Sequence, residues 1–280
     1  MSTTETTTTA IDTPPDRRNH DIGEEQTYTL DNAWEHARRR LGLIEASYDP
    51  GSTRRLQALG VGPGWHCLEV GAGGGSIPRW LCSKVGRTGR VCAIDLDTHF
   101  VEEIQATNLD VARLDVTTGG LPRAAYDLVH TRAVLAHLPS RERVLDALVA
   151  SLRPGGWLLL EEPDEYASQA LGSGLHGEVL AKFNAGLGRA GVDFTWARHL
   201  PALFHNRGLG DVGAESEVPL FEGSSPAAEL LRLSVIQVRE LAVAAGAAPE
   251  SLDQWDVLLS APGQWFPGYA MVAAWGRRQR

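Results

Sequence analysis

A glycine-rich turn is the first feature of this sequence that could do chemistry. Glycines stand at positions 71, 73 and 75 of the segment LEVGAGGGS (residues 68–76), between an apolar run that predicts a strand and a pattern that predicts a helix. Glycine allows a tight turn and lets a ligand approach the backbone closely. The alternative is a simple strand-to-helix turn that binds no ligand. The neighbouring residues must distinguish the two.

Three acidic residues are expected at the ends of successive strands. Asp95 follows the second predicted strand, 24 residues after Gly71, where an acid can accept hydrogen bonds from both hydroxyls of a ribose. Asp115 ends the third strand, where it could accept from an adenine amino group. Glu69 ends the first strand, near the expected place of an ammonium group. Together they suit a cofactor with an amine, a ribose and a sulfonium, and they suit a pyrophosphate badly.

A nicotinamide dinucleotide is the competing cofactor for such a turn. Its fingerprint requires GxGxxG or GxGxxA, whereas this turn reads GxGxG and has Ser76 at the third position. The third glycine allows close packing of helix on strand in dinucleotide folds. Its absence, together with Asp115, argues against an NAD-dependent oxidoreductase.

Five segments in order resemble the motif set of class I S-adenosylmethionine (SAM) dependent methyltransferases. They are LEVGAGGGS, AIDLD (93–97), RLDV (113–116), YDLVHTRAVLAHL (126–138) and LRPGGWLLLEEPD (152–164). The resemblance is close over about residues 65–164 and extends loosely to the segment 268–275. Residues 27–52 are similar to the N-terminal segment of small-molecule methyltransferases, many of them from bacterial secondary metabolism.

The resemblance implies an α/β fold and a set of cofactor contacts. The fold is a Rossmann-like seven-stranded sheet, mostly parallel with its last strand antiparallel, with a helical N-terminal lid and cap insertions. The glycine turn should pass near the methionine part of SAM, with Glu69 in direct or water-mediated contact. Asp95 should hold the ribose, and His130 should offer backbone contact. The implied cofactor-binding residues are Glu69, Gly71, Ala72, Gly73, Gly75, Asp95, Leu96, Asp115, Val116 and His130.

Methyl transfer from a sulfonium is an in-line displacement in which the protein mainly positions and desolvates the nucleophile. A general base matters only if the nucleophile is protonated at neutral pH, as a phenol is. His130, His137 and Asp164 are the candidates for that base, with ordinary packing as the alternative role of both histidines.

Acceptor contacts are expected from the N-terminal segment and from the end of the fifth strand. The candidate substrate-binding residues are Tyr28, Trp34, His36 and Glu162. Phe194, Trp196, Trp255 and Trp265 fall in variable segments and could form an aromatic pocket, although core packing is the commoner use of tryptophan.

The chain divides into three predicted regions. Residues 1–26 are rich in Thr, Asp, Glu and Pro and predict a disordered leader. Residues 27–60 predict a helical lid, with helices over 32–48 and 53–59 separated by the breaker Asp49-Pro50-Gly51. Residues 61–280 predict the methyltransferase domain, in which strands and helices alternate, including a helix over 98–106. Insertions at about 165–196 and 220–266 could cover the carboxyl edge of the sheet.

Composition narrows the partners. The chain has 280 residues and a net charge of −9, which argues against a nucleic-acid partner because phosphate neutralisation needs a basic face. No apolar run approaches the ~20 residues of a membrane span, and the start lacks the pattern of a signal peptide, so we expect no membrane partner and a cytoplasmic protein. The three cysteines show no metal-ligand spacing, and we expect no metal. A small-molecule acceptor is the expected partner, and a homodimer is possible.

The sequence therefore predicts an enzyme that methylates O, N or C of a small, apolar or aromatic metabolite, in natural-product biosynthesis. The alternative is a SAM-binding protein of the same fold with a non-methylating role, such as a cyclase or a binding module, because fold does not determine function. An NAD-dependent oxidoreductase is the less favoured third reading.

Overall fold

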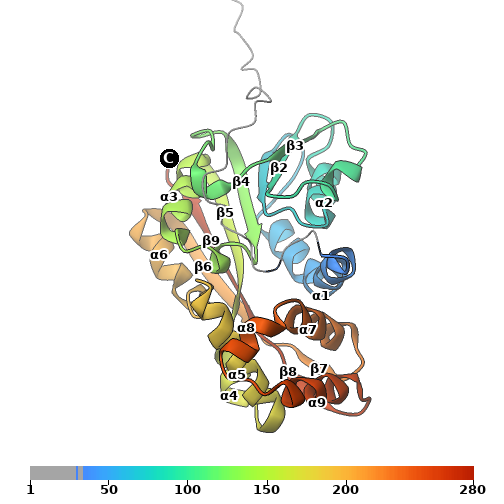
Figure 1. The fold of residues 1–280 in the computed structure, drawn as a ribbon. Helices are drawn as coiled ribbons and strands as arrows, with labels where there is room; N and C mark the ends of the chain where they lie inside the picture. Colours follow the sequence, from blue (N-terminus) through green and yellow to red (C-terminus); the bar gives the residue numbers. More distant parts are fainter. Residues whose placement is uncertain (1–29, 31–33) are drawn as a thin grey trace, which may run out of the picture.

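A seven-stranded sheet organises the part of the chain described by the computed structural model, which is Leu30 and residues 34–280 (Figure 1). The expected leader and Tyr28 lie outside the described residues. The strand order is β3-β2-β1-β4-β5-β9-β6. The strands are β1 (His66–Val70), β2 (Arg90–Asp95), β3 (Leu109–Arg113), β4 (Tyr126–Arg132), β5 (Leu152–Asp164), β6 (Leu209–Glu217) and β9 (Ala270–Arg278).

Strand direction confirms the expected fold class. β1 to β5 are paired in parallel, whereas β9 runs antiparallel to both β5 and β6. The order reverses between β1 and β4, which continue to β2 on one side and to β5 on the other. In open α/β sheets ligands bind outside the carboxyl ends of the strands at such a reversal.

Helices cover both faces of the sheet because its central strands are apolar on both sides. Leu68 and Val70 of β1 face one core, which contains α3 (Arg141–Ser151) and α6 (Leu200–Asn206). Cys67 faces the other core, together with Leu56 of α1 (Ala37–Ala58) and with α2 (Ser76–Val85). Short 3-10 turns in the described residues are η1 (Val101–Glu103), η2 (Val116–Thr118), η3 (Leu135–His137) and η4 (Ala197–His199).

A separate, mainly helical group lies beyond the carboxyl ends of β4 and β5, at the lower end of Figure 1. It has its own apolar core around Phe183, Trp255 and Phe266. Its elements come from residues 166–189 and 220–267, the two segments where insertions were expected. They are α4 (Tyr166–Leu171), α5 (Gly174–Arg189), β7 (Leu220–Glu222), α7 (Pro226–Gln237), α8 (Arg239–Ala244), α9 (Pro249–Ser260) and β8 (Trp265–Pro267).

The predicted helix break at Asp49-Pro50-Gly51 is wrong. α1 runs without interruption from Ala37 to Ala58 and contains Pro50. The hydroxyl of Ser52 donates to the carbonyl of Tyr48 at 3.2 Å, and that of Thr53 donates to the carbonyl of Asp49 at 2.8 Å. The C-terminal half is also bound to the sheet through Ser52 and Arg55, so tertiary contacts offset the helix penalty of proline.

The helix predicted over 98–106 is also wrong, because only the single turn η1 forms there. Phe100 packs against α1 near Leu41, whereas the next residue, Val101, packs with Ala72 and Ala93. A short 3-10 turn places these adjacent side chains in two different clusters. The apolar spacing that suggested a helix therefore arises because this segment is buried against two different clusters.

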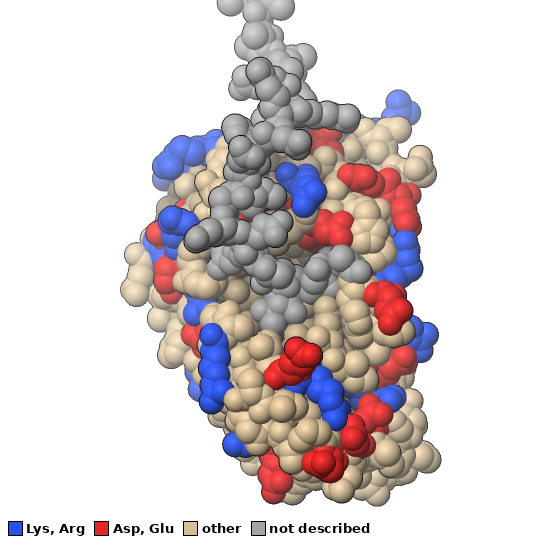
Figure 2. Space-filling model, viewed as in Figure 1, with Lys and Arg blue, Asp and Glu red and all other residues tan. Residues whose placement is uncertain are grey.

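The surface of the described part mixes charges of both signs. Figure 2 shows acidic and basic side chains interspersed over the visible face, with no broad basic area on it. No helix in residues 34–280 is long and apolar enough to cross a membrane. In the same residues no group of three or more His, Cys, Asp or Glu side chains is placed to hold a metal ion.

Candidate active site

The glycine turn lies at the point where the strand order reverses. The N–H groups of Gly71 and Ala72 donate to the carbonyl of Ile94 on β2, at 2.9 and 3.3 Å. Gly71, Gly73 and Gly75 have φ values of +73°, +53° and +90°. A Cβ at Gly71 would lie 2.2 Å from Cγ2 of Val134, so both the conformation and the close approach of the loop after β4 require glycine here.

Asp95 lies against this turn. Its Oδ2 accepts from the backbone N–H of Gly73 at 2.8 Å, and its Oδ1 accepts from that of Asp97 at 3.1 Å. Burial raises the pKa of Asp95, against the backbone donors that lower it. Each carboxylate oxygen offers about two acceptor sites, so each can still accept a hydroxyl hydrogen bond.

Asp115 follows a residue that is bonded to Asp95, since the N–H of Leu114 donates to the carbonyl of Asp95 at 2.9 Å. Its Oδ1 accepts from the N–H and the hydroxyl of Thr117, at 2.8 and 2.6 Å, and so shapes the turn η2. Val116 is buried, whereas the side chain of Leu96 is 42% exposed. Two carboxylates and an open apolar surface fit the ribose hydroxyls, the amino group and the flat face of an adenosyl group.

Glu69 and His130 face each other on adjacent strands, where they are paired in register. His130 Nδ1 lies 2.7 Å from Glu69 Oε2, and its Nε2 lies 3.3 Å from Glu161 Oε2 on β5. All three side chains are buried. Burial alone would lower the pKa of His130, but the two carboxylates outweigh it and raise the pKa to about 9. The ring is therefore an imidazolium at neutral pH.

Two residues of α1 extend this line of buried hydrogen-bonded groups. Glu161 accepts from Nη1 of Arg55 at 2.9 Å and from the hydroxyl of Ser52. Burial opposes its ionisation, but His130, Ser52 and Arg55 lower the pKa of Glu161 to about 2. The expected lid helix is thus connected to the end of β1 through alternating acidic and basic groups.

Glu162 points to the other side of β5 and holds the loop after β4. Its oxygens accept from the backbone N–H groups of Val134, Leu135 and Ala136 at 3.2, 2.9 and 3.2 Å. The next residue, His137, is partly buried and its ring meets that of Phe194, with ring centroids 5.7 Å apart. Burial and the nearby Arg40 and Arg141 lower the pKa of His137 to about 4, so its ring is neutral at pH 7.

Asp164 is engaged at the end of β5. Its two oxygens accept from Nε and Nη2 of Arg198 at 2.9 and 2.5 Å, and its Oδ1 also accepts from the N–H of Tyr166 at 2.9 Å. The carboxylate is fully buried. These partners give Asp164 a role in joining β5, α4 and η4.

An aromatic cluster lies between β4, α5 and β9. Phe194 packs on both His137 and Tyr269, the latter at a ring-centroid distance of 5.3 Å. The hydroxyl of Tyr269 donates to Oδ1 of Asn184 on α5. Burial raises the pKa of Tyr269 far above its ordinary value, and the charge of Glu165 adds to this effect. We refer to His137, Phe194, Tyr269 and Asn184 as the aromatic cluster.

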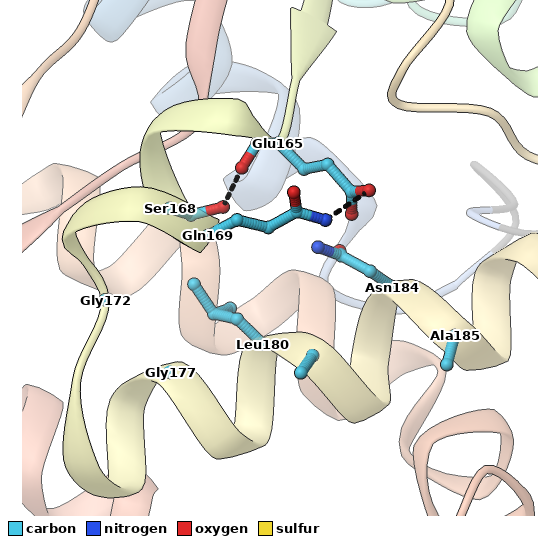
Figure 3. Close-up of a pocket in the computed structure, with 9 residues that line it drawn as sticks. Glu165, Ser168, Gln169, Gly172, Gly177, Leu180, Asn184 and Ala185 are labelled. Carbon is cyan, nitrogen blue, oxygen red and sulfur yellow. Dashed lines mark hydrogen bonds between the residues drawn. The ribbon is translucent and has the colours of Figure 1, made fainter.

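A cavity of about 410 Å³ borders this cluster, between α4 and α5. Figure 3 shows the side chains of Glu165, Gln169 and Asn184 pointing toward one another on one side of it, with Leu180 on the other. Glu165 also donates its backbone N–H to the carbonyl of Phe194 at 3.0 Å. The cavity therefore shares Asn184 and a backbone connection with the aromatic cluster.

The other expected acceptor residues are dispersed. Trp34 packs on α1 and meets the ring of His36, whose side chain is 54% exposed. Trp196 donates its ring N–H to Glu142, and Trp255 donates to His176, so both are held in cores. Trp265 is exposed on β8. Of the four aromatic residues proposed for a pocket, Phe194 alone joins the aromatic cluster.

Sequence reasoning did not single out Tyr269, Asn184, Ser52 or Arg55. Tyr269 stands directly before the last strand, which was its one local signal. Asn184 lies in α5, and no sequence pattern indicated that this helix would contact Tyr269. Ser52 and Arg55 lie just after the supposed helix break, which hid their common position on α1.

Comparison with known proteins identifies a family. Residues 28–212 match the family described as methyltransferase domain. Methyltransferase str2 of Strobilurus tenacellus is 30% identical over 115 residues, which are 39% of this chain and 39% of that protein. The ubiquinone/menaquinone biosynthesis C-methyltransferase UbiE of Laribacter hongkongensis is 29% identical over 113 residues, 38% of this chain and 46% of that protein. The chain thus spans less than half the length of these relatives.

Solved structures show the same fold at low identity. Phosphoethanolamine N-methyltransferase 2 of Haemonchus contortus, in complex with phosphomonomethylethanolamine and S-adenosylhomocysteine, has a TM-score of 0.57. It is 14% identical, and the match covers 89% of this chain and 59% of that one. At this identity the likeness concerns the fold.

Proposed function

The chain belongs to the methyltransferase domain family, whose methyl donor is S-adenosylmethionine, and we propose that it methylates a small, apolar or aromatic metabolite. One observation carries the cofactor assignment. Asp95 accepts from the backbone of Gly73 within the glycine turn while its oxygens keep acceptor capacity, beside Asp115 and the exposed Leu96. These acceptors and the apolar surface beside them suit an adenosyl group.

When bound, SAM would supply a methyl group activated by its sulfonium, for in-line transfer to an acceptor atom with S-adenosylhomocysteine as the leaving group. The residues of the chain bind, orient and exclude water. Asp95 and Asp115 would hold the adenosyl part, and Glu69, paired with His130, would face the amino group of the methionine part. α1 would act as a lid, because Leu41 and Glu45 lie directly over Gly73 and Gly74.

The acceptor would bind beside the aromatic cluster. Phe194, Tyr269 and the neutral ring of His137 offer flat, largely apolar surfaces. The adjoining cavity of about 410 Å³ is in the size range of small-molecule sites, and Glu165 and Asn184 give it a polar end. One relative is a ubiquinone/menaquinone biosynthesis C-methyltransferase, which is in keeping with a ring-shaped acceptor.

The three candidate bases favour an acceptor that needs no strong base. His130 already carries a proton between two carboxylates, and Asp164 is held by Arg198. His137 has a pKa of about 4, so it can accept a hydrogen bond but holds a proton poorly at pH 7. An electron-rich ring carbon or a neutral amine fits these groups better than a phenol of ordinary acidity.

The test is transfer of a labelled methyl group from SAM to a panel of small aromatic and amine acceptors. We expect label in at least one acceptor, with equimolar S-adenosylhomocysteine. Tyr269→Phe removes the hydroxyl that binds Asn184 and should raise the KM of that acceptor about 2- to 10-fold, as the loss of one neutral hydrogen bond implies. Trp265→Phe, at an exposed residue of β8, should leave KM unchanged.

The alternatives make different predictions in the same experiment. A non-methylating member of the fold would bind S-adenosylhomocysteine but transfer no label to any acceptor. A dinucleotide enzyme would be stabilised thermally by NAD and not by SAM. Either result would overturn the proposal, as would equal KM values for Tyr269→Phe and Trp265→Phe.

A further inference from the structure

Glu162 makes an unusual set of hydrogen bonds for a carboxylate inside a sheet. Its Oε1 accepts from the N–H groups of Val134 and Leu135, and its Oε2 accepts from that of Ala136. The side chain is fully buried. Three consecutive backbone donors thus converge on one side chain, and a buried donor that loses its acceptor costs about 1–3 kcal/mol.

The loop held in this way separates the two halves of the site. At its start, Ala133 has φ of +55°, in the left-handed region that non-glycine residues rarely adopt. Val134 then lies against Gly71 of the glycine turn. His137, at its end, packs on Phe194 of the aromatic cluster. The position of this loop therefore affects both the donor side and the acceptor side.

We propose that Glu162 is a positioning residue for methyl transfer. It holds residues 133–137 so that Val134 contacts the glycine turn while His137 faces the acceptor. The proposal rests on the proposed function for the direction of transfer. It assigns Glu162 no contact with substrate, since the side chain is fully buried and both of its oxygens face the backbone of the loop.

The charges around Glu162 are few. Arg141 of α3 lowers its pKa and itself binds the carbonyls of Leu135 and Ala136, at 3.3 and 3.4 Å, and Asp193 at 3.1 Å. Within residues 133–137 the titratable side chain is that of the neutral His137, and Arg40 of α1 acts on it. On β9, the residue paired with Glu162 is the apolar Val272.

This setting makes the loop sensitive to pH. Burial raises the pKa of Glu162 to about 7, against the backbone donors and Arg141. A proton on Oε2 would turn the charged acceptor of the Ala136 N–H into a neutral and weaker one. The hydrogen bonds between Glu162 and the loop should therefore weaken as the pH falls through about 7, and the rate of methyl transfer should fall with them.

The experiment compares Glu162→Gln with Glu178→Gln, a matched change at an exposed residue of α5. Gln can still accept from Val134 and Leu135, but its NH₂ group faces the N–H of Ala136. We expect the hydrogen-exchange protection factor of Ala136 to fall at least tenfold and kcat to fall at least tenfold. The Kd of S-adenosylhomocysteine should change less than threefold, and Glu178→Gln should match the wild type in all three.

A second measurement uses the wild-type chain, in case Glu162→Gln does not fold. Protection factors at 134–136, compared with those in α3, should decrease between pH 8 and pH 6. Unchanged protection over that range, or wild-type protection and kcat in Glu162→Gln, would overturn the positioning role. A wild type that transfers no methyl group but shows the predicted exchange would instead refute the proposed function alone.

Discussion

The buried imidazolium of His130 predicts a specific dependence of stability on pH. The ordinary histidine pKa of about 6.5 applies to the unfolded chain, and in the folded chain Glu69 and Glu161 raise the pKa of His130 to about 9. A difference of this size, at 1.36 kcal/mol per pH unit, corresponds to about 3 kcal/mol. Because the folded pKa is the higher one, this stabilisation is complete below pH 6.5 and disappears as the pH rises through 9.

The perturbation that isolates this contribution is His130→Gln. Glutamine fills much of the same space but carries no charge, so Glu69 would lose its charged partner in a buried site, whereas Glu161 would keep Arg55. Breaking a buried ion pair from one side costs about 3–5 kcal/mol. We expect the variant to be less stable than the wild type by that amount at pH 6, and the gap to shrink by about 3 kcal/mol at pH 9.5.

Urea unfolding at both pH values provides the measurement, with the free energy of unfolding extrapolated to water. His99→Gln is the control, because His99 is half-exposed and pairs with Asp97 at the surface. Its difference from the wild type should be small at both pH values. If the gap between His130→Gln and wild type is the same at pH 6 and pH 9.5, His130 is not charged in the folded chain and the electrostatic reasoning is wrong.

Two further predictions concern the glycine turn and Asp95 beside it. Asp95→Ala should weaken S-adenosylhomocysteine binding by about 1–3 kcal/mol, because it removes the acceptor of the Gly73 N–H and of the ribose hydroxyls. Calorimetry should show this loss, whereas Asp110→Ala, at a surface ion pair of β3, should bind normally, and equal affinities would count against the site. Gly71→Ala should lower the melting temperature more than Gly86→Ala. Both glycines have positive φ, but only at Gly71 would the new Cβ meet a neighbour, Val134. Identical melting temperatures would contradict the close approach of that loop.

Local patterns in the sequence were sufficient for the fold class and for the glycine turn. The strand, turn and helix around residues 66–85 are contiguous, and so are the strands that precede Asp95 and Asp115, so their order could be inferred from short segments. The antiparallel last strand followed from the family resemblance, and the pairing of β9 with β5 and β6 confirms it. The residue roles drawn from the same resemblance stay predictions.

The sequence by itself determined the glycine turn and which acidic residues stand at the ends of its strands, because those properties depend on neighbours a few positions away. The tertiary structure alone decided what the buried polar groups do. His130 is an imidazolium only because β1 and β5 bring Glu69 and Glu161 to its two nitrogens, and Glu162 holds a loop only because β4 ends beside it. Tyr269 and Asn184, 85 positions apart, meet through the packing of α5 near the start of β9. Charge state and hydrogen bonding in a buried site depend on such distant partners, which no local pattern specifies.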